Sequence, residues 1–228
     1  MKKNKKMFFT MSMVLIILSL SIYSIGEGKK QTLELNPGVE DLSFLSQLEK
    51  EVIVELNMAR TEPAKYAEFV NDLKKKFESD YQYFSDGAFV VTSEGIEGVD
   101  EAVRFLRKVE PISPLTVSKG LSSAAKAQVL YQGPDGLTGH SGKGGASPMD
   151  RMNRYGKWKY VSGENINYGN KTAREIVMQL IIDDGVKDRG HRMNIFNEDF
   201  HVVGVGCGPH AEYEWMCVMD FAGGYQEM

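Results

Sequence analysis

Two histidines beside glycines are the residues best suited to chemistry in this chain of 228 residues. His140 follows Gly139 in a glycine-rich stretch, and His191 follows Gly190. Glu164 lies between them in the sequence Ser-Gly-Glu-Asn-Ile. Neutral imidazole and carboxylate groups are good ligands for zinc-like divalent ions. The residue types therefore allow a metal site, or a structural cluster of histidines that are hydrogen-bonded to carboxylates.

The spacing of these residues is compatible with both the metal site and the structural cluster. The chain contains neither an HExxH motif nor a Cys-x-x-Cys pair, which are the local signatures of many zinc sites. Ser141 adjoins His140 but does not lie in a Gly-x-Ser-x-Gly elbow, which disfavours a serine nucleophile. Gly142-Lys143 lacks the upstream glycine of a phosphate-binding loop.

Apolar residues at spacings of three and four predict the helices that would position these side chains. Helices are predicted at 45–59, 64–73, 100–109 and 121–129, and after the caps Ser147 and Thr172. The stretch 79–99 is expected to be an insertion or loop. Glu164 precedes the helix that opens at Thr172, and His191 follows it, so an antiparallel return would bring both residues to one region.

Two β-prone segments near the end of the chain predict a hairpin, with its turn at Gly208-Pro209. Pairing Cys207 with Cys217 puts the cysteines opposite each other at a separation that a disulfide bridges. The same register places Val205 opposite Met219 and Val203 opposite Phe221, on one apolar face. His201 and His210 are expected to be exposed. Since helices come first and strands cluster late, with another at 158–168, the fold class is α+β.

The N-terminus predicts export. Four lysines within residues 2–6 precede an apolar run at 7–25, which is typical of a secretory signal peptide or a membrane anchor over residues 1–25. We expect a linker at 26–40 and one domain at 41–228, secreted or tethered to the outer side of the membrane through residues 7–25. Export also favours a disulfide. The net charge of −4 argues against a nucleic-acid partner.

Four segments, taken in order, resemble the CAP superfamily, which includes the cysteine-rich secretory proteins, antigen 5, plant pathogenesis-related proteins and bacterial SCP-like proteins. They are ELNMARTEPAKYA (55–67), GHSG (139–142), SGENI (162–166) and RGHRMNIFNEDFHVVGVGCG (189–208). The resemblance covers roughly residues 45–224. It implies a three-layer α-β-α sandwich.

The resemblance also implies a cleft of two histidines and two acids that binds a divalent metal such as zinc. His140, Glu164 and His191 match three of the four residues, and Asp183 or its neighbour Asp184 stands where relatives carry a glutamate. Two functions remain open. One is a module that binds a lipid, glycan or protein partner. The other is a metal-dependent extracellular hydrolase that uses Glu164 as its base, so whether the protein is an enzyme is undecided.

Overall fold

A computed structural model describes residues 21–22, 31–32, 41–85 and 88–228. The chain divides into two units, Met1–Pro37 and Gly38–Met228. In the first unit, β1 (Ser21–Ile22) pairs antiparallel with β2 (Gln31–Thr32). The predicted export segment at 1–25 and linker at 26–40 lie almost wholly outside the described residues. Within the described ranges, no helix is long and apolar enough to cross a membrane.

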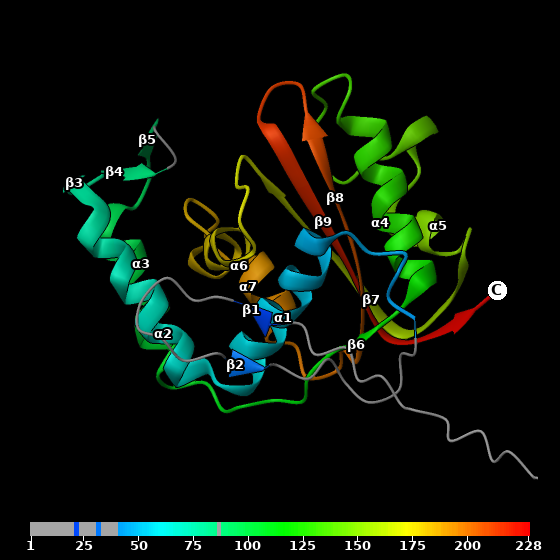
Figure 1. Cartoon of the computed structure of the whole chain (residues 1–228), viewed down its shortest axis with the longest axis horizontal. Coiled ribbons are helices and arrows are strands. Elements are labelled where there is room, and N and C mark those ends of the chain that lie inside the picture. The colour runs from blue at the N-terminus through cyan, green and yellow to red at the C-terminus, as the bar shows by residue number, and fades with distance from the viewer. Residues whose placement is uncertain (1–20, 23–30, 33–40, 86–87) are drawn as a thin grey trace, which may run out of the picture. The chain divides into compact units, whose positions relative to one another are not determined.

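The second unit contains a three-layer α-β-α sandwich built on a four-stranded sheet (Figure 1). The strands, in spatial order, are β6 (Thr116–Val117), β8 (Val202–His210), β9 (Glu214–Glu227) and β7 (Gly156–Tyr168). One face is covered by α4 (Lys119–Gln132) and α5 (Pro148–Met152). The other is covered by α1 (Gln47–Thr61), α6 (Ala173–Ile182) and α7 (Gly190–Ile195). The predicted α+β sandwich is confirmed.

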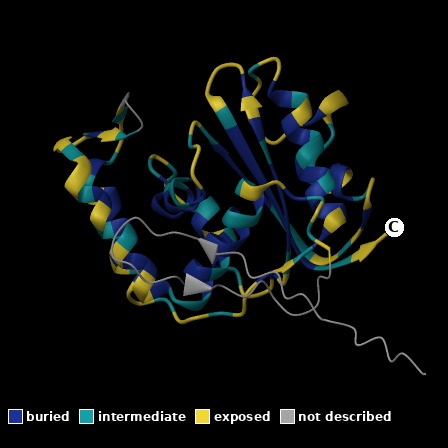
Figure 2. Cartoon of the chain, viewed as in Figure 1, coloured by how far each residue is buried: buried dark blue, intermediate teal, exposed yellow. Residues whose placement is uncertain are grey.

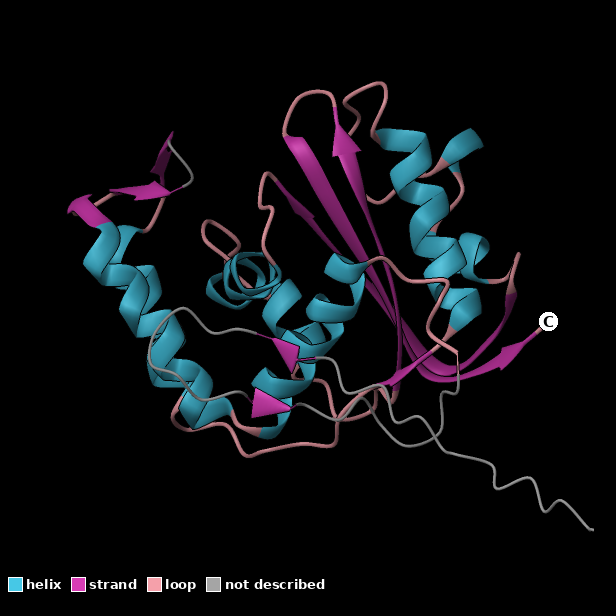
Figure 3. Cartoon of the chain, viewed as in Figure 1, coloured by secondary structure: helices cyan, strands magenta, loops and turns pink. Residues whose placement is uncertain are grey.

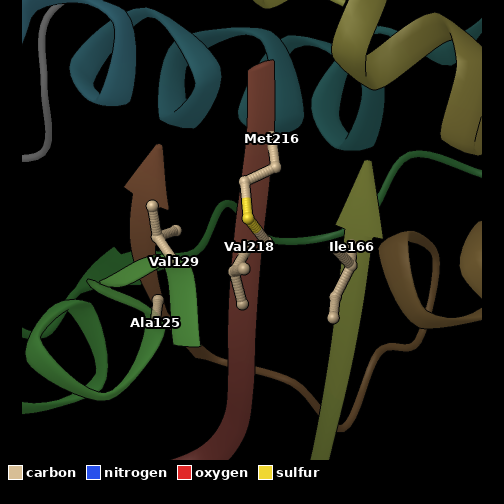
Figure 4. Close-up of a cluster of buried hydrophobic side chains, with 5 residues drawn as sticks. All are labelled: Ala125, Val129, Ile166, Met216 and Val218. Atoms are coloured by element: carbon tan, nitrogen blue, oxygen red, sulfur yellow. The ribbon is translucent and has the colours of Figure 1, made fainter. Parts of the chain in front are cut away.

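Helix α4 lies unusually close to the sheet because β8 presents glycines to it. A Cβ atom at Gly204 would lie 2.1 Å from the backbone of Leu121, and one at Gly206 would lie 2.5 Å from the backbone of Lys126. Only glycine fits at such an approach. The buried contact that results is shown in Figure 4 and joins Ala125 and Val129 of α4 to Ile166, Met216 and Val218 of the sheet. Figure 2 shows that the strands of the sheet consist mostly of buried residues.

The remaining elements form a helical arm with a small sheet at its end (Figure 3). They are α2 (Pro63–Asp72), the 3₁₀ helix η1 (Leu73–Lys76), β3 (Phe77–Ser79), β4 (Gln82–Ser85), β5 (Ala88–Val91) and α3 (Gly95–Leu106). Of the insertion or loop expected at 79–99, the loop is wrong, because β4, β5 and the start of α3 lie there. Helix α3 begins earlier than predicted because the Asp184 carboxylate accepts hydrogen bonds from the backbone N–H groups of Ser93 and Glu94, at 2.7 and 2.8 Å.

The hairpin of β8 and β9 confirms the predicted register and the Cys207–Cys217 disulfide. Its turn lies at 211–213 rather than at Gly208-Pro209. The turn is fixed by His210, whose Nδ1 accepts hydrogen bonds from the backbone N–H groups of Glu212 and Tyr213. His210 is therefore buried, and the expectation that it would be exposed was wrong.

Removing the disulfide should destabilise the domain without unfolding it. We expect the Cys207→Ala/Cys217→Ala variant to lose about 2–3 kcal/mol of unfolding free energy, because the bridge closes only a short loop. Urea unfolding with and without a reductant measures the difference. Wild-type protein in reductant should match the double variant. Two alkylatable thiols in the oxidised protein, or identical unfolding curves, would contradict the prediction.

Candidate functional site

The first histidine forms a pair with a buried acid. His140 lies in the loop between α4 and the short 3₁₀ helix η2 (Lys143–Gly145), and its Nδ1 is 2.8 Å from Oε1 of Glu164 on β7. The Glu164 side chain is only 1% exposed, whereas that of His140 is 53% exposed. The second carboxylate oxygen of Glu164 forms an ion pair with Arg151 of α5. The sequence analysis expected Glu164 to come to one region with His191, whereas the Glu164 side chain pairs with His140.

The second histidine forms a matching pair with Asp183. Nδ1 of His191 is 2.6 Å from Oδ1 of Asp183, and the backbone N–H of His191 donates to Oδ2 at 2.9 Å. Asp183 ends α6 in the left-handed conformation, with φ of 57°, which is uncommon outside glycine. Asp184 points instead to the start of α3. Asp183 is therefore the acid that contacts His191.

The two pairs are attached to consecutive residues of the edge strand β7. The Asn165 side chain donates to the backbone carbonyl of His191 at 2.9 Å, while Glu164 binds His140. Because neighbouring side chains of a strand point to opposite faces, the pairs approach this strand from its two sides. In the part of the chain that the structure describes, no hydrogen bond engages Nε2 of His140 or of His191. Both rings therefore leave that nitrogen available.

The His140 loop is held by buried or half-buried polar side chains that the sequence analysis did not single out as site residues. Gln132 donates to the carbonyl of Gly139 at 2.6 Å. The Tyr168 hydroxyl accepts from the Gly139 N–H and donates to Gln132, each at 3.0 Å. Arg151 donates to the carbonyl of His140 at 2.9 Å. One signal in the sequence could have pointed to these residues. A glutamine such as Gln132 near the buried face of a predicted helix needs a polar partner.

Asp220 is a further buried acid that the sequence analysis missed. It lies on β9 directly opposite Glu164 and is completely buried. Among the described residues, neither oxygen of its carboxyl group has a hydrogen-bond partner of good geometry. Burial and the nearby charge of Glu164 raise the pKa of Asp220 well above its usual range, against an opposing effect of Arg151. The protonated form of Asp220 is therefore favoured in this position, opposite the Glu164 that pairs with Arg151.

Because the folded-state pKa of Asp220 is raised, this residue should make the protein less stable as the pH rises. Above about pH 4 this carboxyl loses its proton in the unfolded chain but keeps it in the folded protein. The free energy of unfolding therefore falls as the pH rises. We expect Asp220→Asn to be more stable than wild type at pH 7 by about 1 kcal/mol or more, and this advantage should shrink toward pH 4. Thermal unfolding across this pH range measures it. Asp199→Asn, at an exposed acid, is the control, and a pH-independent difference for Asp220→Asn would contradict the prediction.

Comparison with known proteins gives a family match, a relative and two similar solved structures. Residues 101–221, just over half of the chain, match the model of the cysteine-rich secretory protein family, abbreviated CAP. The uncharacterized protein YkwD of Bacillus subtilis (strain 168) is 32% identical over 100 residues, which are 44% of this chain and 37% of YkwD. The chain thus spans well under half the length of that relative.

Two solved structures are similar over about half of this chain. An outer surface protein from Borrelia burgdorferi has a TM-score of 0.42 at 17% identity, covering 51% of this chain and 80% of its own. An extracellular protein containing a SCP domain from Bacillus anthracis str. Ames has a TM-score of 0.39 at 18% identity, covering 49% of this chain and 34% of its own.

Proposed function

This chain belongs to the cysteine-rich secretory protein (CAP) family, and from that premise we propose that it is an extracellular binding module whose histidine–acid cleft takes up a divalent ion. The observation that supports this is the pairing of His140 and His191, each through Nδ1, with a buried carboxylate. Metal-ligating histidines usually make such a bond, because the carboxylate fixes the tautomer and directs the other ring nitrogen at the ion.

In this proposal, a zinc-like ion would be held by the two imidazoles. Glu164 already binds His140 and Arg151, and Asp183 already binds His191, so both acids would orient the histidines rather than contact the ion. Over the described ranges, no three His, Cys, Asp or Glu side chains converge on a common point. Catalytic zinc sites usually provide three protein ligands. The donor set therefore favours reversible binding over metal-dependent hydrolysis.

The proposed location is outside the cytoplasm. The family to which the chain belongs is one of secretory proteins, and the Cys207–Cys217 bridge supports the same compartment because disulfides persist in oxidising surroundings. In this proposal, residues 1–25 direct export, either as a cleaved signal or as a tether. The partner would be a lipid, a glycan or another protein.

Zinc titration of the purified, chelator-treated chain tests the ion site. Calorimetry should give a dissociation constant of roughly micromolar order, with affinity falling as the pH falls because protons compete for the ligand nitrogens. His140→Ala and His191→Ala should each weaken binding at least about tenfold, as expected for loss of one of two ligands. His201→Ala, at an exposed histidine outside both pairs, is the matched control. A His140→Ala/His191→Ala variant that binds zinc like wild type would contradict the proposal.

A further inference from the structure

Strand β7 contains a bulge with an unusual residue at its sharpest point. Lys159 pairs with Gly224 and Ser162 pairs with Ala222, so Tyr160 and Val161 together oppose a single residue of β9. Tyr160 has a φ of 70°, in the left-handed region. In bulges of this kind, glycine normally occupies the left-handed position. The two strands bend strongly on the way to the C terminus (Figure 1).

Packing does not explain why a tyrosine is held in this conformation. Tyr160 is 85% exposed, so its ring contributes little to the core. The opposite strand also makes room for it. A Cβ atom at Gly223 would lie 3.2 Å from Cβ of Tyr160 and 3.0 Å from the carbonyl oxygen of Asp199. Residues held in strained backbone conformations cluster at active sites, ligand clamps and switch regions.

The strained tyrosine borders a surface hollow. The hollow has a volume of about 330 Å³ and is lined by Tyr160, Val161, Asp199, His201 and Gly223. Among the residues that the structure describes, none forms a hydrogen bond or an ion pair with the Asp199 carboxylate or the His201 imidazole. The hollow therefore presents an aromatic ring, a hydrogen-bond acceptor and a group that can both donate and accept, and none of the three is committed elsewhere.

We propose that this hollow binds one sugar ring of a glycan. The ring of Tyr160 offers an apolar surface for the C–H face of a pyranose, while Asp199 and His201 can bind its hydroxyl groups. The Asp199 carboxylate would repel an anionic ligand, and an organic cation would leave the donor of His201 unused. None of the lining residues belongs to the two histidine–acid pairs, so this site is separate from the proposed ion cleft.

Titration of the ¹⁵N-labelled chain with chitotriose and with cellotriose, followed by NMR, tests the proposal. We expect at least one trisaccharide to shift the amide signals of residues 159–161, 199–201 and 223, with a dissociation constant in the millimolar range because one ring makes few contacts. Tyr160→Phe keeps the ring and should bind like wild type. Tyr160→Gly should bind at least about tenfold more weakly, since it removes the apolar surface.

Folding provides the internal control, because glycine suits the backbone at position 160. The melting temperature of Tyr160→Gly should equal or exceed that of wild type, so loss of binding cannot be attributed to unfolding. The His140→Ala/His191→Ala variant should bind the sugar unchanged. The proposal is overturned if neither trisaccharide shifts these signals, or if Tyr160→Gly binds as tightly as wild type. It is also overturned if the organic cation tetramethylammonium shifts these signals and neither sugar does.

Discussion

Replacing Arg60 by alanine should cost about 3–5 kcal/mol of unfolding free energy, because several buried carbonyl groups lose their donors together. Arg60 is completely buried in α1. Its guanidinium donates to the carbonyls of Ser113, Ile195, Asn197 and Phe200 at 2.6–3.0 Å. No carboxylate in the described part of the chain forms an ion pair with it. Burial lowers its pKa to about 10, so it remains charged at neutral pH.

The bonds from Arg60 fix the chain just after α7, which carries His191. We expect Arg60→Lys to lose most of the same stability, since an ammonium cannot reproduce the planar fork of donors. Urea unfolding followed by tryptophan fluorescence measures both losses. Arg107→Ala removes an exposed ion pair with Glu68 and should change stability by less than about 1 kcal/mol. An Arg60→Ala protein within that range of wild type would show that the carbonyls find other partners.

Arg60 also shows how far a motif can be interpreted from sequence. It lies in the segment ELNMARTEPAKYA, which helped to carry the family resemblance, yet the letters do not show whether the segment acts in chemistry or in folding. The structure gives the arginine a structural role, because every partner is a backbone carbonyl. A side chain whose partners are more than 50 residues away cannot be assigned them from local spacing.

Features that depend on local periodicity were predictable. The register of β8 and β9 followed from one pairing of Cys207 with Cys217, because strand side chains alternate and the apolar face had to match. Helix α4 likewise followed from its repeat of buried residues. By contrast, the start of α3 depends on a cap from Asp184, which is 91 residues away from Ser93.

The acids of the site likewise differ in how far the sequence could predict them. Glu164 could be identified by its motif. The family position left Asp183 and Asp184 as alternatives, and the structure brings Asp183 to His191. Asp220 carries no motif, although a carboxyl in the middle of an apolar strand is itself a signal of a special environment. Its position against Glu164 arises only when β9 pairs with β7, so the three-residue group of Arg151, Glu164 and Asp220 was not predictable from spacing.

Replacing Arg151 by methionine should cost about 3–5 kcal/mol, because removing one partner of a buried ion pair leaves the other charge uncompensated. The Arg151 side chain is 3% exposed and that of Glu164 is 1% exposed. The variant would leave Glu164 buried beside Asp220 without a cation. It would also remove the hydrogen bond from Arg151 to the His140 carbonyl, so the loop that carries His140 should loosen. Arg154→Met, at an exposed arginine three residues further along the chain, is the matched control.

A double-mutant cycle with Glu164→Gln separates the charge from the packing. If the uncompensated carboxylate causes the loss, Arg151→Met/Glu164→Gln should be more stable than Arg151→Met alone, with a coupling energy of about 1–3 kcal/mol. Stability of Arg151→Met should also recover as the pH falls, because protonation of Glu164 then replaces the missing cation. Additive effects in the cycle, with no recovery in acid, would instead mean that Arg151 stabilises the domain through its packing and its bond to the His140 loop. The histidine–acid pair would then hold its geometry independently of the charge beneath it.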